Sequence, residues 1–126
     1  MGAAADREGM PVPAMVQPGN TPEELRAALV RLAPESVPTF DAERAEALRS
    51  ARESVSAAPM RRFTGQWAIQ VAIERFPERA ARLRELEARA AEVEDVEEAR
   101  AITSEIGAIL DVARAQASIG QEPGTA

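Results

Sequence analysis

Along most of the chain, apolar residues recur at steps of three and four positions, the spacing that gathers them on one face of an α-helix. No segment alternates apolar and polar residues in the way that predicts a half-buried strand. The sequence contains no internal repeat. The pattern therefore predicts an all-α fold, a small bundle of about five helices.

We expect the helix over residues 60–76 to be the central one. Its large apolar residues fall on two faces, Phe63, Trp67 and Val71 on one and Ile69, Ile73 and Phe76 on the other. A helix that is apolar on more than one face is normally covered on more than one side. This helix carries the only tryptophan of the chain, and the other helices should pack around it.

Three other positions of the central helix carry expectations of their own. Gly65 lies in the helix interior, where glycine costs about 1 kcal/mol relative to alanine, and we expect another helix to approach closely there. Gln66 and Gln70 should be partly buried amides at the edge of the core.

A short helix should begin at Thr21. The Thr21 side chain can cap it, Pro22 suits its first position, and Glu24 can complete a capping box. Its apolar face consists of Leu25, Ala28, Leu29 and Leu32. Pro34 should end the helix after about 11 residues, so it needs tertiary packing to persist.

A second helix should run from Pro38 to Pro59. Its apolar positions at helical spacing are Phe40, Leu48, Ala51 and Val55, with Ala47 between them. Most of its remaining surface is glutamate and arginine, which is typical of a solvated face.

Residues 78–118 hold two apolar runs at coiled-coil-like spacing, separated by acidic residues. The first run is Ala80, Leu83, Leu86, Ala90 and Val93; the second is Val96, Ala99, Ile102, Ile106, Ile109 and Ala113. The acidic cluster between them consists of Glu92, Glu94, Asp95, Glu97 and Glu98. The lack of glycine and proline is compatible with one long helix. The like charges and the change of phase favour a helical hairpin broken near residues 93–95, where Asp95 and Glu98 form a capping-box pattern.

These elements predict a single helical domain over residues 21–119. Residues 1–20 are rich in glycine and proline breaks without periodicity, which predicts a disordered tail. The alternative is a segment that becomes ordered on a partner. Residues 120–126 should form a frayed C-terminus.

Composition limits the chemistry of the chain. All 15 basic residues are arginine, and lysine, histidine, cysteine and tyrosine are absent. This excludes a thiolate nucleophile, an imidazole base, a Schiff-base lysine and the common zinc sites. We therefore predict a protein that is not an enzyme, with no catalytic, cofactor-binding or metal-binding residues.

The net charge of −6 argues against a default binder of phosphate backbones, because such domains are usually basic. It fits a protein that meets a basic partner. No apolar run approaches the about 18 residues of a transmembrane helix, and the N-terminus lacks the pattern of a secretory signal. We expect a cytoplasmic protein without membrane contact.

Several pieces between residues 21 and 72 match the pattern of a known family. They are Pro22 with Leu25–Leu29, Phe40–Glu43 with Leu48 and Ala51, and Pro59 with Phe63 and Trp67. On these pieces the chain resembles a family of short, uncharacterised actinobacterial proteins, a domain of unknown function. Relative to that pattern, the chain inserts residues between its first two helices and continues well past Trp67, where many relatives end.

Proteins of this family look antitoxin-like: they are small, acidic and helical, and some are encoded beside RelE/ParE-like toxins. The resemblance therefore implies an interaction protein that masks a basic toxin. The family offers no catalytic or binding residues that could be assigned to this chain. From the charge and apolar patterns we expect Leu83, Leu86, Glu94 and Asp95 to bind the partner, by apolar docking with acidic complementarity.

Two alternatives remain open. In one, the helices around Trp67 and residues 75–89 form a helix-turn-helix-like DNA-binding regulator, with Arg79, Arg82 and Arg89 on phosphates; the acidic net charge disfavours it. In the other, the apolar seam over residues 83–113 holds a homo-oligomeric helical scaffold.

Overall fold

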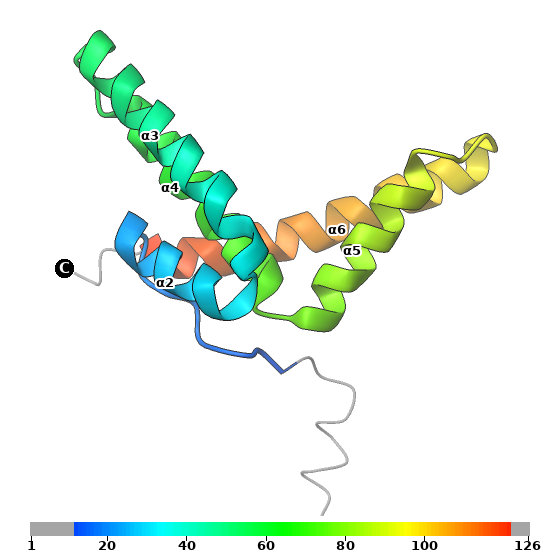
Figure 1. The fold of residues 1–126 in the computed structure, drawn as a ribbon. Helices are drawn as coiled ribbons and strands as arrows, with labels where there is room; N and C mark the ends of the chain where they lie inside the picture. Colours follow the sequence, from blue (N-terminus) through cyan, green and yellow to red (C-terminus); the bar gives the residue numbers. More distant parts are fainter. Residues whose placement is uncertain (1–11, 122–126) are drawn as a thin grey trace, which may run out of the picture.

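The computed structural model describes the backbone of residues 12–121 and the side chains of residues 12–118. The described chain is helical and contains no strand, so the predicted all-α fold is confirmed. The elements in chain order are α2 (Pro22–Leu32), the short 3-10 helix η1 (Pro34–Ser36), α3 (Val37–Ser54), α4 (Ala58–Glu74), α5 (Pro77–Ala90) and α6 (Val96–Gln121). Figure 1 shows two pairs of helices, α3 with α4 and α5 with α6, that diverge from a common base.

The expected central helix is confirmed, because α4 contacts α2, α3, α5 and α6. Trp67 is 8 % exposed, and Val71 and Ala72 are fully buried. From α3, the fully buried Phe40 places its ring 5.0 Å from that of Phe63 and 5.2 Å from that of Trp67. The apolar residues on both faces of α4 are thus what brings four helices together.

The α2 helix forms as its sequence predicts. Thr21 Oγ1 accepts a hydrogen bond of 3.1 Å from the backbone N–H of Glu24, and Pro22 occupies the first position. Leu25, Ala28 and Leu29 are buried, and their side of the helix faces the core. Capping and tertiary packing together account for a helix of only 11 residues.

The end of α3 differs from the expectation. The helix stops at Ser54, and Val55 adopts a left-handed conformation with φ 51° and lies 90 % exposed. Val55 therefore is not part of an apolar face. Pro59 does not end α3 either; it lies in the first turn of α4, where its missing N–H costs nothing, and it is buried.

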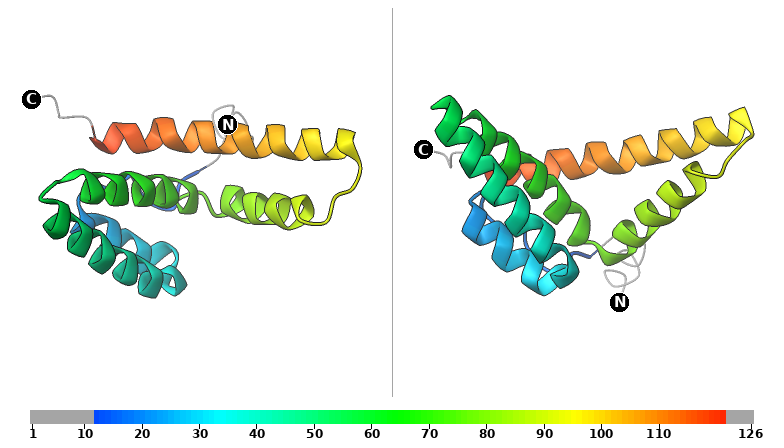
Figure 2. Two further views of the ribbon diagram at one scale, coloured as in Figure 1. Left: turned by 90° about the horizontal axis from the view of Figure 1, so that it is seen from above. Right: turned by 45° about the horizontal axis from the view of Figure 1, so that its top comes forward.

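Residues 78–118 form a hairpin, as the sequence favoured, because α5 ends at Ala90 and α6 begins at Val96. Asp95 Oδ2 accepts a hydrogen bond of 2.8 Å from the backbone N–H of Glu98, which caps α6. Figure 2 shows α4 and α5 following one another along one side of the long α6. The first half of α6 packs on α5 and its second half on α4, so α6 joins the hairpin to the rest of the bundle.

The packed chain begins before residue 21. The segment of residues 12–20, expected to belong to a disordered tail, follows a defined path against α4: Ala14 N donates to Arg75 O at 2.7 Å, and Gln17 Nε2 donates to Ala68 O at 3.2 Å. Met15 packs against the core. At the other end, α6 continues through Gln121. Residues 120 and 121, expected to belong to a frayed end, are therefore helical. Residues 1–11 and 122–126 lie outside the described chain.

Candidate functional site

The closed end of the α5–α6 hairpin, residues 91–98, is the most acidic part of the described surface; we call it the hairpin tip. Its five acidic residues are all exposed: Glu92, Glu94, Asp95, Glu97 and Glu98. Beside it lies an open hollow of about 580 Å³, with Val96 and Ala99 among its lining residues. Val96 is 64 % exposed. The tip therefore offers several carboxylates around an uncovered apolar side chain.

The four residues expected to bind a partner occupy two different environments. Glu94 and Asp95 are exposed at the tip and line the hollow. Leu83 and Leu86 are 7 % and 1 % exposed, and together with Ile102 they form the interior between α5 and α6. The two leucines therefore hold the hairpin together, and a partner that approaches the tip would not touch them.

The hairpin is also held by ion pairs across its two helices. Arg82 binds Glu105 through two hydrogen bonds, of 2.7 Å from Nε and 2.8 Å from Nη2, and also donates to Glu85. These hydrogen bonds from Arg82 lower the pKa of the Glu105 carboxyl and raise the pKa of Arg82. Nearer the tip, Arg89 pairs with Glu98 at 3.1 Å.

Sequence reasoning did not find a group of nearly buried charges at the junction of α4 and α5. Arg75 is 7 % exposed and donates to Met15 O at 2.9 Å. Arg79 donates to Ala72 O and, at 2.8 Å, to Gln116 Oε1. Both guanidinium groups lie over the ring of Phe76, at 5.0 Å and 4.4 Å. Within residues 12–118 neither arginine forms an ion pair.

Burial explains the electrostatics of these two arginines. It lowers the pKa of Arg75, and burial together with the nearby charge of Arg75 lowers the pKa of Arg79. Arg79 binds the carbonyl of Ala72 near the C-terminal end of α4, where a cation complements the helix dipole, and Arg75 binds the carbonyl of Met15 in the N-terminal segment. Arg79, Arg82 and Arg89, the residues of the DNA-binding alternative, each donate a hydrogen bond to another part of the chain, and the pair of Arg89 with Glu98 is exposed.

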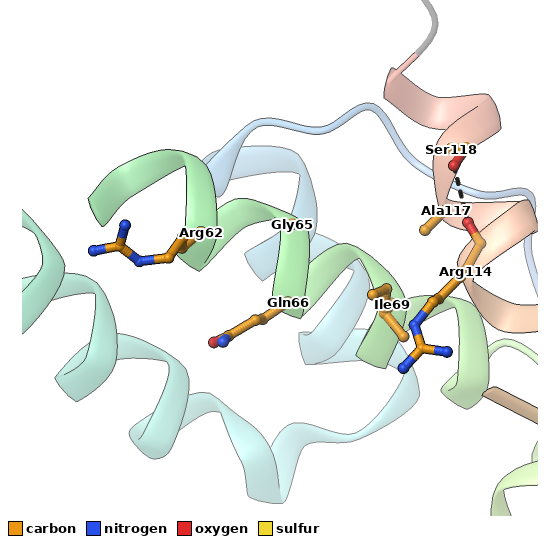
Figure 3. A pocket seen from close by; sticks show the side chains of 7 residues that line it. All are labelled: Arg62, Gly65, Gln66, Ile69, Arg114, Ala117 and Ser118. Carbon is orange, nitrogen blue, oxygen red and sulfur yellow. Dashed lines mark hydrogen bonds between the residues drawn. The ribbon is translucent and has the colours of Figure 1, made fainter. Parts of the chain in front are cut away.

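A second hollow, of about 390 Å³, lies between α4 and the end of α6. Figure 3 shows Arg62, Gly65, Gln66 and Ile69 along α4, with Arg114 of α6 reaching towards Ile69. A side chain at Gly65 would meet nothing within 4 Å, so no helix approaches closely there, contrary to the expectation. Gln66 is exposed rather than partly buried, because this side of α4 faces the hollow, whereas Gln70 is partly buried as expected.

A comparison with protein families identifies the family of the chain. A model described as a family of unknown function, DUF6247, matches residues 13–118. The chain belongs to the DUF6247 family. The match reaches far beyond the residues 21–72 on which the sequence resemblance rested, so the C-terminal hairpin is part of the DUF6247 domain and not an extension of it. Comparisons with curated proteins and with solved structures found no match.

The DUF6247 match also includes most of the segment before α2. It begins at residue 13, next to Ala14 and Met15, which contact Arg75. Within the described chain, no group of acidic residues has the arrangement of a metal site. None of the described helices combines the length and apolar character needed to cross a membrane.

Proposed function

We propose that this DUF6247 protein is a non-enzymatic interaction module that binds a basic partner protein through the hairpin tip. The observation that carries the proposal is the tip itself, where exposed carboxylates surround the uncovered Val96 at the end of a projecting hairpin. Such a surface can steer a basic partner electrostatically and bury an apolar contact after docking. The partner-binding residues of the proposal are Glu94, Asp95 and Val96.

The fold supports this role over the alternatives. The apolar seam of Leu83, Leu86 and Ile102 is used inside the hairpin, so it is not available to hold a scaffold of several copies. Of the arginines proposed to contact DNA, Arg79 and Arg82 donate partly buried hydrogen bonds to other helices, and Arg89 pairs with Glu98 at the surface. The non-enzymatic part of the proposal rests on the side-chain inventory, which lacks the common bases and nucleophiles.

An antitoxin-like role would make this basic partner a toxin. A toxin that binds RNA or a ribosome presents a basic surface, and an acidic tip could cover it. A cytoplasmic location, where such a partner would be met, belongs to the same proposal.

The test compares the tip with an equal number of exposed acidic residues scattered elsewhere on the surface. The tip variant Glu92→Gln/Glu94→Gln/Asp95→Asn removes three charges and keeps an asparagine that can still cap α6. The control Glu35→Gln/Glu78→Gln/Glu87→Gln removes three exposed charges that form no hydrogen bond in the structure. Each tagged protein is used to capture partners from the native lysate at low and at high salt, followed by mass spectrometry and titration of the purified partner.

We expect one stoichiometric basic protein with the wild type and the control, and loss of that protein at high salt because exposed charges are screened. The tip variant should bind it about tenfold more weakly or worse. Equal binding by the tip variant, or recovery of no protein besides the bait, would contradict the proposal.

A further inference from the structure

Between residues 97 and 117, one side of α6 is covered and the other is open. The buried residues Ile102, Ala113 and Ala117 lie on one side. We call the opposite side the outer face of α6; it consists of Glu97, Arg100, Ser104, Gly107, Asp111 and Arg114. Gly107 is partly exposed and the other five are exposed. Arg114 borders the hollow beside α4, and no described element covers the other five residues.

The charges on the outer face are self-complementary. The spacing of its six residues is three, four, three, four and three, which reads the same from either end. If a second α6 is laid antiparallel on this face, Glu97 lies opposite Arg114 and Arg100 lies opposite Asp111 of the second copy. Two-fold symmetry repeats each pair, so four acidic–basic pairs form at once. The reverse, parallel arrangement would not match unlike charges in this way.

The charged residues of the outer face can pair with a second copy without destabilising the monomer. Within the described chain, Glu97 and Arg100 form no ion pair, and Arg114 has only an exposed contact of 3.2 Å with Asp111. Exposed pairs of this kind contribute little to stability. A second copy could therefore rearrange them at small cost.

The centre of the outer face is shaped for close approach. In the antiparallel register Ser104 lies opposite Gly107, so two small residues meet near the symmetry axis. A Cβ atom added at Gly107 would meet nothing within 4 Å, so no contact inside the chain requires glycine there. Glycine in a helix interior costs about 1 kcal/mol relative to alanine. Close approach of α6 from a second copy would account for glycine at this position.

We infer that two copies of the chain associate through the outer faces of α6 as an antiparallel, two-fold symmetric dimer. The two-fold symmetry limits the assembly to two copies, because the outer face of each copy is fully covered by the outer face of the other. The dimer does not depend on the proposed partner, and it could form whether or not that partner exists.

Charge reversal tests the dimer and its register. The variant Arg100→Glu/Arg114→Glu makes the face wholly acidic, and Glu97→Arg/Asp111→Arg makes it wholly basic. Each variant alone should self-associate about tenfold more weakly than the wild type or worse, because all four pairs become repulsive. An equimolar mixture should form a heterodimer, since every pair is then complementary. Sedimentation equilibrium over a wide concentration range measures the three proteins and the mixture.

Two further variants separate association from folding. Arg52→Glu/Arg61→Glu changes the net charge as much as the acidic variant, but on exposed arginines outside α6, and should dimerise like the wild type. Gly107→Leu adds a side chain where the monomer has space and replaces a weak helix former, so it should block the dimer while raising the melting temperature of dilute protein. A wild type that stays monomeric at every concentration, or a mixture that forms no heterodimer, overturns the inference.

Discussion

The indole N–H of Trp67 on α4 donates a hydrogen bond of 2.9 Å to Oε1 of Glu43 on α3. The same indole meets the ring of Phe40 edge-on, with 5.2 Å between the ring centroids. The only tryptophan of the chain is therefore held to α3 by one polar and one aromatic contact. An apolar ring with a satisfied N–H fits a site that is nearly but not completely buried.

Replacing Glu43 by alanine should lower the free energy of unfolding by about 1 kcal/mol, because the Trp67 N–H loses its acceptor. Urea unfolding followed by the fluorescence of this tryptophan measures the change. Glu46→Ala is the control, since the Glu46 carboxylate pairs with Arg49 on the exposed side of α3 and should contribute little. If both substitutions lower the free energy of unfolding equally, the hydrogen bond between Trp67 and Glu43 contributes no more than the exposed pair.

The features predicted correctly from the sequence are those encoded within a few residues. Thr21 and Asp95 cap their helices through N–H groups three positions ahead. The two-faced apolar pattern around Trp67 identified the central helix, because covering both faces requires neighbours on both sides. The hairpin break also has a local cause, the like charges of the acidic cluster next to a cap.

The features that were missed depend on contacts between distant residues. Arg75 reads as a surface charge, but its hydrogen-bond acceptor, Met15 O, is 60 positions away in the sequence. Leu83 and Leu86 were expected to contact a partner, because the sequence is also compatible with one long helix and does not establish that α6 returns to cover them; the structure buries both. Only the fold distinguishes an apolar stripe that a partner covers from one that the chain covers itself.

Val55 should be a position where a smaller residue stabilises the protein. A β-branched residue with φ 51° is strained, and glycine adopts this conformation at helix ends without a steric penalty. Val55→Gly should raise the free energy of unfolding by about 1 kcal/mol. The side chain is 90 % exposed, so few contacts are lost.

Val112→Gly is the control for this substitution. Val112 is also partly exposed, at 49 %, but lies inside α6, where glycine weakens the helix. Thermal unfolding should therefore shift upward for Val55→Gly and downward for Val112→Gly. A lower melting temperature for Val55→Gly would mean that the valine side chain has a contact that outweighs its backbone strain.

The packing of α6 on α4 leaves no room at Ala113. This residue is fully buried in the core, so Ala113→Leu should cost about 1–3 kcal/mol through overpacking. Ala115→Leu introduces the same side chain two positions later on the exposed side of the helix and should be close to neutral. Chemical denaturation at low protein concentration compares the two variants. Equal stability would mean that the second half of α6 does not pack on α4.

The pair of Arg82 and Glu105 should make the hairpin sensitive to acid. Hydrogen bonds from Arg82 hold the pKa of Glu105 below its ordinary value of 4.5 in the folded state. A lowered carboxyl pKa stabilises the fold above the unfolded pKa, and this contribution is lost as the pH falls through the folded pKa. Glu105→Gln should therefore destabilise the protein slightly near neutral pH and lose less stability than the wild type below about pH 4.5.

Thermal unfolding at a series of pH values measures this difference. Some loss in acid should remain in Glu105→Gln, because Arg26 lowers the pKa of Asp41 in the same way. Glu87→Gln removes an exposed carboxylate that makes no hydrogen bond, so it should keep the acid dependence of the wild type. If Glu105→Gln and Glu87→Gln lose stability in parallel as the pH falls, the Arg82–Glu105 pair does not couple the hairpin to pH. A smaller loss in Glu105→Gln alone would locate that coupling at the contact between α5 and α6.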